Sequence, residues 1–381
     1  MQRSSIYILL LSVVGLVSLG MVMLFSTSAF AQESHGDIYY FVKRDAFWLI
    51  IGVMVCLLGA MTDYQLWQRS WKIWFGVSVV LLALCFVPHV GMKINGSHRW
   101  INLRITNFQP SELAKIAAVF FVAWWFSRPE TNPRKILDGF VIPIGGVAIL
   151  IGLIAKEVDL GSAALIGATT LAICFVGGAN WLMIGGFFGA GLAGLLGIAM
   201  LIPERAARMT TFLHPESDKL GKGLQQWQAL IAFGSGGFEG LGLGEGRQKM
   251  LYLPYAHTDF IFPMIGEELG LRITWLVLMG YILIILCGGL VAANAKDRFG
   301  KLLATGILLL ISLQAAVNIG MTTSLLPNKG MPLPFISYGG SNLAVSLFMV
   351  GILVNIHRTG IPIVRVTDRH LVLAERSVPR I

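Results

Sequence analysis

Long runs of apolar residues alternate with short polar stretches along most of the chain. The runs lie near residues 6 to 25, 47 to 62, 71 to 88, 111 to 126, 139 to 155, 160 to 176, 181 to 202, 260 to 293, 302 to 325 and 335 to 356. Many approach the roughly 20 residues that an α-helix needs to cross a hydrocarbon core about 30 Å thick. The pattern predicts an all-α, polytopic membrane protein of about ten transmembrane helices, folded as one domain over residues 1 to 381. Solid apolar runs exclude a β-barrel, whose strands alternate.

The longest polar stretch, residues 203 to 260, separates the seventh and eighth predicted helices. Ten spans place both termini on one side of the membrane. Lys and Arg are almost equally frequent in the segments of the two sides, so their count alone does not fix the orientation. Many of them fall in the long loop, however, where the positive-inside rule weakens. We therefore predict a cytoplasmic N-terminus, an extracytoplasmic 203 to 260 loop and a cytoplasmic basic tail at residues 357 to 381.

Composition narrows the class of partner. Hydrophobic residues make up 55% and charged residues 13% of the chain, whose net charge is +9. So basic a membrane protein favours anionic partners, either phospholipid headgroups or a phosphorylated substrate, and we expect no nucleic acid. Each cysteine lies in an apolar run without C-x-x-C spacing, so metal or redox chemistry is not expected of Cys56, Cys85, Cys174 and Cys287.

Charged residues cluster before the fourth predicted helix. Arg99 lies in the preceding loop, and Pro110 suits the first turn of the helix. Glu112 and Lys115 are then three residues apart on one helix face and can form an ion pair at the membrane boundary. The pair has two interpretations: a structural anchor for the helix end, or part of the polar lining of a substrate cleft.

Lys156, Glu157 and Asp159 form a second cluster, in the short connection between the fifth and sixth helices. Flanked by apolar sequence, these groups cannot face lipid and must face water, one another or a ligand. A solvated interhelical loop and a ligand site both remain open.

The long loop contains two further features. Apolar residues recur at helical spacing from 224 to 231, which predicts an amphipathic helix along the interface. Glycines are frequent from 234 to 246, but the Walker A pattern of a nucleotide-binding loop is absent. The glycines instead indicate tight, non-helical backbone, with Arg247 and Lys249 adding positive charge after it.

His257, Thr258 and Asp259 directly precede the eighth apolar run, which carries Glu267 and Glu268. An ionisable residue at a bilayer boundary is costly and is a functional candidate by default. Asp259 is therefore the leading candidate for chemistry, and Glu267 or Glu268 would follow. The structural alternative is that Asp259 caps the helix, a role that Asp commonly fills.

A proline- and glycine-rich segment from 327 to 341 carries Ser337 and Ser341. Such residues are tolerated at membrane depth where the backbone lines a cavity or is buried in protein. The segment predicts a broken or re-entrant helix start, although a helix break that serves only packing is the alternative.

Four motifs, in this order, resemble the SEDS family of cell-wall polymerases, which includes FtsW and RodA. They are GSHRWINL with FQPSELAK, KEVDLGSA, GEGRQKMLYLPYAHTDFIFPMIGEELG and MPLPFISYGGSN, between residues 96 and 342. The third is more similar to the division protein FtsW than to the elongation protein RodA. Departures from the family pattern, which concern loop conformation, are Arg104, Val158, Ser324 and Asn342.

The resemblance implies a peptidoglycan glycosyltransferase that polymerises lipid II at the outer face of the bacterial cytoplasmic membrane, for septal wall synthesis in cell division. It implies a class B penicillin-binding protein and other divisome membrane proteins as partners, and dependence on a divalent cation, Mg²⁺ or Mn²⁺. The essential acid of the family corresponds to Asp259, which would take the proton of the acceptor hydroxyl. The expected substrate contacts are Arg99, Glu112, Lys115, Lys156, Glu157, Asp159, Arg247, Lys249, His257, Thr258, Glu267, Ser337 and Ser341.

Three other functions stay open at this point. The same buried charges could form the path of a flippase for lipid-linked precursors, although no pair of interrupted helices in corresponding positions stands out. An elongation-type polymerase and a non-enzymatic scaffold of a division complex are the others. If the protein is a polymerase, we expect basic residues to hold the pyrophosphate of the substrate, namely Arg99, Lys156, Arg247 and Lys249.

Overall fold

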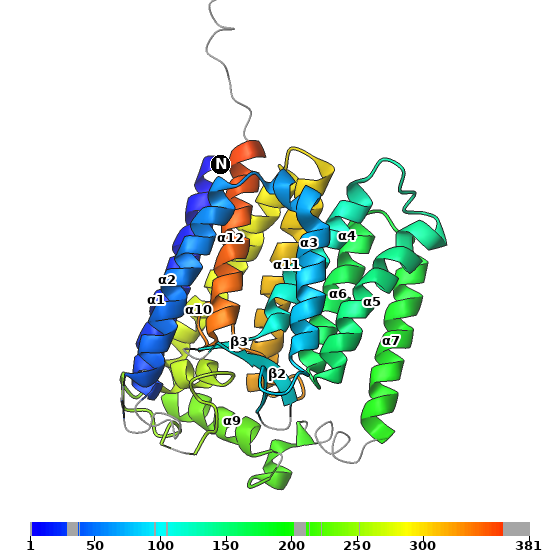
Figure 1. Cartoon of the computed structure of the whole chain (residues 1–381). Coiled ribbons are helices and arrows are strands. Elements are labelled where there is room, and N and C mark those ends of the chain that lie inside the picture. The colour runs from blue at the N-terminus through cyan, green and yellow to red at the C-terminus, as the bar shows by residue number, and fades with distance from the viewer. Residues whose placement is uncertain are drawn as a thin grey trace, which may run out of the picture.

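The computed structural model describes residues 2–28, 37, 39–94, 97–103, 106–201, 211–212, 214–221, 223–250 and 252–360. Long helices run side by side in one bundle (Figure 1). They are α1 (Gln2–Ser28), α2 (Tyr40–Met61), α3 (Tyr64–Leu84), α4 (Pro110–Ser127), α5 (Ile142–Lys156), α6 (Leu160–Val176), α7 (Trp181–Leu201), α10 (Ile261–Ala293), α11 (Arg298–Thr322) and α12 (Gly340–Gly360). Shorter elements are the π-helix η2 (Leu137–Val141), the 3-10 helix η3 (Pro215–Asp218) and α9 (Leu224–Gly236).

Six helical segments of the described chain are long and apolar enough to cross a membrane: Ser4–Ser28, Tyr40–Met61, Leu137–Lys156, Ile261–Ala293, Arg298–Thr322 and Gly340–Gly360. Two shorter apolar segments, Leu160–Val176 and Trp181–Gly191, add to them. The bundle agrees with the predicted polytopic helical fold, whereas the total of ten spans stays a prediction. The predicted amphipathic helix is present as α9. The tail beyond residue 360 lies outside the described residues.

A three-stranded antiparallel sheet is the main departure from the all-α prediction. Its strands, β1 (Gly91–Ile94), β2 (Ser97–Asn102) and β3 (Asn107–Phe108), lie in that order. In the register of β1 and β2, Met92 is opposite Trp100, and a shift follows between Met92 and Lys93. Polar and apolar residues do not alternate along β2, whose sequence is SHRWIN, and β3 has only two residues, so hydrophobic periodicity gave no signal here. The sheet is what fixes Arg99, near the middle of β2.

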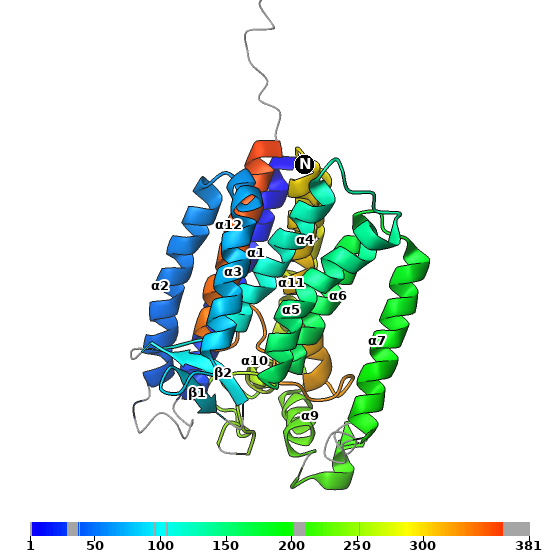
Figure 2. The ribbon, with the colours of Figure 1, turned by 45° about the vertical axis from the view of Figure 1, so that its right-hand side comes forward.

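The two ends of the bundle differ (Figures 1 and 2). The start of α1 and the end of α12 lie at one end, whereas the sheet and α9 lie at the other. We call the second the sheet end. Both views place α7 at the edge of the bundle, and its side chains are mostly exposed, as suits a lipid-facing helix. In contrast, α4 and α12 are buried along most of their length.

The eighth predicted helix is interrupted. Within α10, Gly270 has φ 76° and ψ 179°, which only glycine adopts readily. The break frees backbone groups, and the glycine-rich loop pairs with them: Leu241 and Gly242 donate to the carbonyls of Glu267 and Glu268 at 2.9 and 3.0 Å. On the other side of the break, the Leu271 amide donates to the Gly237 carbonyl at 2.9 Å. The glycines thus permit close, non-helical backbone, as their sequence pattern predicted.

Candidate active site

Asp259 lies at the sheet end of α10 but does not cap it. The N-cap residue is Phe260, and this helix start has no side-chain cap hydrogen bond. Within the described chain, no hydrogen bond to the half-buried Asp259 carboxylate is present. A Cβ atom on Gly330 would lie 2.9 Å from its Oδ2, so a larger residue there would require the Asp259 carboxylate to shift. The structure therefore favours a role other than capping for this carboxylate.

Hydrogen bonds to the backbone hold Asp259 in place. The Asn318 side-chain amide, from α11, donates to the carbonyls of Asp259 at 2.9 Å and Met331 at 2.7 Å. Ser337 Oγ donates to the Thr258 carbonyl at 2.7 Å. These bonds tie the segment before α10 to the proline-rich segment before α12, so the carboxylate is carried by a doubly anchored loop.

The ring of His257 packs among aromatic side chains from two other segments. Its centroid lies 4.3 Å from that of Phe41, on α2, and 6.1 Å from that of Tyr338. The Tyr338 amide donates to the His257 carbonyl at 3.1 Å. Burial lowers the pKa of His257 to about 4, so its imidazole is uncharged at neutral pH.

Two charged residues from other elements influence the pKa of Asp259. Burial raises the pKa of Asp259 to about 6, the positive charge of Arg99 opposes this, and the negative charge of Asp159 adds to it. A carboxylate with such a pKa is ionised at neutral pH and accepts a proton more readily than an ordinary aspartate. The structure thus brings together Arg99, Asp159 and Asp259 from three of the four motifs.

Asp159 is held by its own network. It is the N-cap of α6, where its Oδ1 accepts from the Ser162 amide at 3.1 Å. Its Oδ2 accepts from Gln109 Nε2 at 3.2 Å and from Ser111 Oγ at 3.5 Å. Ser341 Oγ in turn accepts from the Gln109 backbone amide at 3.3 Å. Asp159 and Ser341 therefore connect α4, α6 and α12 around the site.

The predicted ion pair between Glu112 and Lys115 is confirmed. Lys115 Nζ lies 2.7 Å from Glu112 Oε2, and the two side chains are only 4% and 3% exposed. Asn342 donates to Glu112 at 2.8 Å, and Lys115 donates to Gln314 at 2.8 Å. The network joins α4, α11 and α12. So deeply buried a pair anchors the helices, which is the structural one of the two interpretations.

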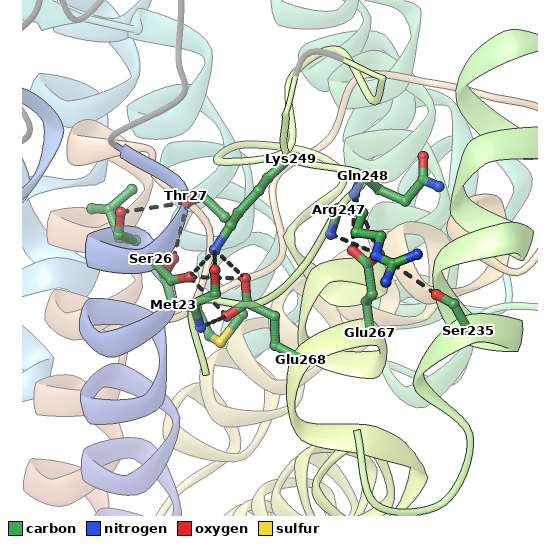
Figure 3. Close-up of polar contacts among 11 residues, drawn as sticks. Met23, Ser26, Thr27, Ser235, Arg247, Gln248, Lys249, Glu267 and Glu268 are labelled. Atoms are coloured by element: carbon green, nitrogen blue, oxygen red, sulfur yellow. Dashed lines mark hydrogen bonds and ion pairs between the residues drawn. The ribbon is translucent and has the colours of Figure 1, made fainter. Parts of the chain in front are cut away.

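Lys249 forms a second buried ion pair, with Glu268 at 2.7 Å, and donates to Ser26 Oγ at 2.8 Å and to the Gly244 carbonyl at 2.7 Å. Figure 3 shows its ammonium between Ser26, on α1, and Glu268, on α10. The charge of Lys249 is thus already matched inside the protein. This corrects the expectation that its charge would be left for an anionic ligand.

Glu267 likewise serves the loop. Its carboxylate accepts from the backbone amides of Arg247 at 3.0 Å and Gln248 at 3.2 Å (Figure 3). Glu267 is buried, and these hydrogen bonds give it a structural role beside the break at Gly270. The side chain of Arg247 is exposed. Lys156 lies with its ammonium 5.0 Å from the centre of the Phe86 ring, so these two cations are not gathered around Asp259 by any contact in the structure.

The divalent cation implied by the resemblance has no evident cage. Among the described residues, no group of three or more His, Cys, Asp or Glu side chains is arranged to hold a metal ion. Asp159 and Asp259 are two carboxylates without a third ligand of these types, and Arg99 faces them with a like charge to the metal. No divalent cation is therefore assigned to these residues.

Comparison with known proteins gives the family. The family model for cell cycle proteins named FtsW, RodA and SpoVE matches residues 7–360. The chain belongs to this family. A probable peptidoglycan glycosyltransferase FtsW from Trichlorobacter lovleyi is 42% identical over 354 residues, 92% of this chain and 92% of that protein. Stage V sporulation protein E from Bacillus subtilis is 37% identical and covers 90% of this chain and 94% of its own.

Solved structures of the FtsW, RodA and SpoVE type share the fold. A chain from a peptidoglycan synthase complex, described as coordinating polymerization and crosslinking, aligns with TM-score 0.76 and 26% identity, over 92% of this chain and 97% of its own. RodA from Thermus thermophilus aligns with TM-score 0.69 and 25% identity, over 93% and 97%. The protein is thus a multi-pass membrane protein, closer in sequence to the FtsW relatives than to this RodA.

Some residues around Asp259 were missed in the sequence. Asn318 is a fully buried polar residue inside an apolar run, and the cost of burying an amide could have marked it. Asp45, buried near the start of α2, was overlooked because the predicted span began only at residue 47. Phe41 and Gln109 gave no signal, because an aromatic residue and an amide near helix starts are ordinary there.

Proposed function

We propose that this member of the FtsW, RodA and SpoVE family polymerises lipid II into glycan strands, with Asp259 as the general base. Relatives from Trichlorobacter lovleyi and Geobacter metallireducens, 42% and 40% identical, are each described as a probable peptidoglycan glycosyltransferase FtsW. The observation that carries the proposal is Asp259 itself: an ionised, half-buried carboxylate, not engaged as a helix cap, on a loop anchored by Asn318 and Ser337.

The chemistry is a displacement at the anomeric carbon of the donor. The Asp259 carboxylate takes the proton of the acceptor hydroxyl as the hydroxyl oxygen bonds to the anomeric carbon. The bond from that carbon to the lipid pyrophosphate breaks, and the pyrophosphate leaves with the electron pair. Arg99, which faces Asp259, supplies positive charge for this leaving group, because a guanidinium matches phosphate oxygens in two parallel hydrogen bonds.

The proposed topology follows from the two ends of the bundle. The start of α1 and the end of α12 lie at the end opposite the sheet (Figure 1). If both termini are cytoplasmic, as proposed, the sheet end with Asp259 faces outward from the bacterial cytoplasmic membrane. Lipid II would then be used where the cell wall is built. The exposed apolar side chains of α7 suit contact with lipid tails.

A transpeptidase is the proposed protein partner. Support comes from the solved synthase complex, described as coordinating polymerization and crosslinking. A class B penicillin-binding protein would cross-link the glycan strands made here. The higher identity to FtsW relatives favours division over elongation as the setting, with other divisome membrane proteins in the same assembly.

Purified protein in detergent, incubated with lipid II, tests the proposal. We expect glycan chains on a gel with the wild-type protein and none with Asp259→Asn, since an amide cannot take up the proton. Glu130→Gln, an exposed change beside Arg128, is the matched control and should polymerise normally. Glycan synthesis by a folded Asn variant would exclude Asp259 as the base. Lipid movement in sealed vesicles without polymer would instead support the flippase.

A further inference from the structure

The turn between α5 and α6 directs two neighbouring carboxylates into the protein. Val158 has φ 68°, in the left-handed region, and its side chain is 56% exposed. The residues on either side, Glu157 and Asp159, are 0% and 4% exposed. Because one left-handed residue separates them, both acids lie inside, at the sheet end and near Asp259.

Both carboxylate oxygens of Asp159 accept hydrogen bonds. Glu157 differs. Within the described part of the chain, neither carboxylate oxygen of Glu157 accepts from a nitrogen or oxygen donor, and only the weakly donating Cys85 thiol acts on the carboxyl as a hydrogen-bond donor. Its backbone carbonyl accepts from Ser97 Oγ, on β2, which ties the turn to the sheet. A buried, unpaired carboxylate is tolerated when protonated and costly when ionised. Glu157 is therefore an acid that the proposed reaction does not yet explain.

Three groups act on the pKa of this carboxyl. The Cys85 thiol approaches from the end of α3, the Arg99 guanidinium from β2 and the Asp159 carboxylate from the start of α6. The adjacent Lys156 has its ammonium over the ring of Phe86. Burial first, and the charge of Asp159 second, raise the pKa of Glu157 to about 8, while Cys85 and Arg99 oppose the rise. Glu157 is thus mostly neutral at pH 7.

Arg99 faces Glu157 and Asp259 but is bound to neither. Its charge influences the pKa of both acids. No ion pair within 4.0 Å joins Arg99 to an acid of the described chain, and its buried Nε has no hydrogen-bond partner there. One guanidinium cannot fully pair with an ionised Glu157 and with a substrate pyrophosphate at the same time.

We propose that Glu157 is a positioning residue whose protonation decides whether Arg99 is free to bind the donor pyrophosphate or is held back by a carboxylate. This inference rests on the proposed function. With Glu157 neutral, Arg99 turns to the substrate; with Glu157 ionised, the two pair and the donor loses its cation. Arg99 then affects both donor binding and the base strength of Asp259. When Arg99 moves from Asp259 towards the donor, the pKa of Asp259 rises and its carboxylate becomes a stronger base.

The inference predicts different pH dependences for KM and kcat. If only the form with neutral Glu157 binds well, KM for lipid II should double near pH 8 and rise about tenfold at pH 9, relative to pH 7. The acidic limb of kcat should lie at higher pH than that of kcat/KM, because kcat reports the substrate complex, in which Arg99 has left Asp259. A role for Glu157 in packing alone would produce neither effect.

Initial rates of glycan synthesis between pH 6 and 9.5 test this. Glu157→Gln, which mimics the neutral acid at every pH, should lose the alkaline rise in KM. Glu130→Gln should keep that rise. An alkaline rise in KM that is the same in Glu157→Gln and wild type overturns the inference while leaving the proposed function intact; no glycan from wild type at any pH overturns the proposed function.

Binding gives a second measurement that needs no change at Glu157. Lipid II binding to Asp259→Asn in nanodiscs should weaken about tenfold from pH 7 to pH 9, by the same linkage. Affinity that is unchanged over this interval would overturn the inference, whether or not Glu157→Gln folds.

Discussion

Removing the ammonium of Lys115 should be among the most damaging single changes outside the site. In Lys115→Met, the buried Glu112 carboxylate keeps Asn342 as a donor at 2.8 Å but loses the cation 2.7 Å away. Gln314 also loses its donor. Breaking a buried pair from one side costs about 3 to 5 kcal/mol, because an unmatched charge is left behind. We expect a loss of this size in the free energy of unfolding.

Equilibrium unfolding in mixed detergent micelles measures the change. Replacing both partners, in Glu112→Gln with Lys115→Met, should recover most of the lost stability, because a neutral pair leaves no buried charge. Glu130→Gln, which breaks an exposed pair with Arg128, should cost less than about 1 kcal/mol. A double variant no more stable than Lys115→Met would refute the reasoning.

Three further predictions concern single positions. kcat/KM for lipid II should fall as the pH drops through about 6, the raised pKa of Asp259 in the protein without substrate. Because the folded protein favours the protonated acid, Asp259→Asn should also be more stable than wild type above pH 6, with the gain lost at lower pH in thermal unfolding. Val158→Gly should stabilise the folded protein by up to about 1 kcal/mol, because glycine adopts the left-handed backbone without strain. Val158→Pro should destabilise it, because proline cannot adopt φ 68°. Equal unfolding midpoints for the two variants and wild type would contradict both expectations. Gly270→Ala should cost at least about 1 to 3 kcal/mol in backbone strain, since its Cβ would also lie 2.4 Å from the Gly240 amide nitrogen; a variant with wild-type unfolding would contradict this.

Local patterns carried much of the fold. Apolar runs located the long helices, because the cost of exposing backbone and polar groups to lipid acts on each segment separately. The predicted ends differ from the observed ones by up to seven residues, at the starts of α2 and α3. Pro110 does open α4, and the i, i+3 spacing of Glu112 and Lys115 was enough to predict their pair. The acid at Asp259 stood out for the same reason, since a charge before an apolar run has a cost that can be judged from the sequence.

The break at Gly270 lay beyond such reasoning. Glycine occurs in many continuous membrane helices, and the segment 260 to 293 is apolar on both sides of its three charged residues, Glu267, Glu268 and Arg272. The helix is interrupted here because Leu241 and Gly242 of the glycine-rich loop replace hydrogen bonds that the break removes. Those partners are distant in sequence, so the balance between a continuous and a broken helix is set only when the loop is folded against it.

The sequence by itself determined a bundle of membrane helices with charged motifs at their ends and Asp259 as the leading candidate for chemistry. Only the tertiary structure decided which charges meet. Lys249 was expected to bind substrate and is matched by Glu268, whereas Glu157 is buried without an ion pair in the described chain, and the charge of Arg99 lowers its pKa. Hydrophobic periodicity is a local property of each helix, but the state of a charge depends on burial and on neighbours from other segments, which the three-dimensional packing alone supplies.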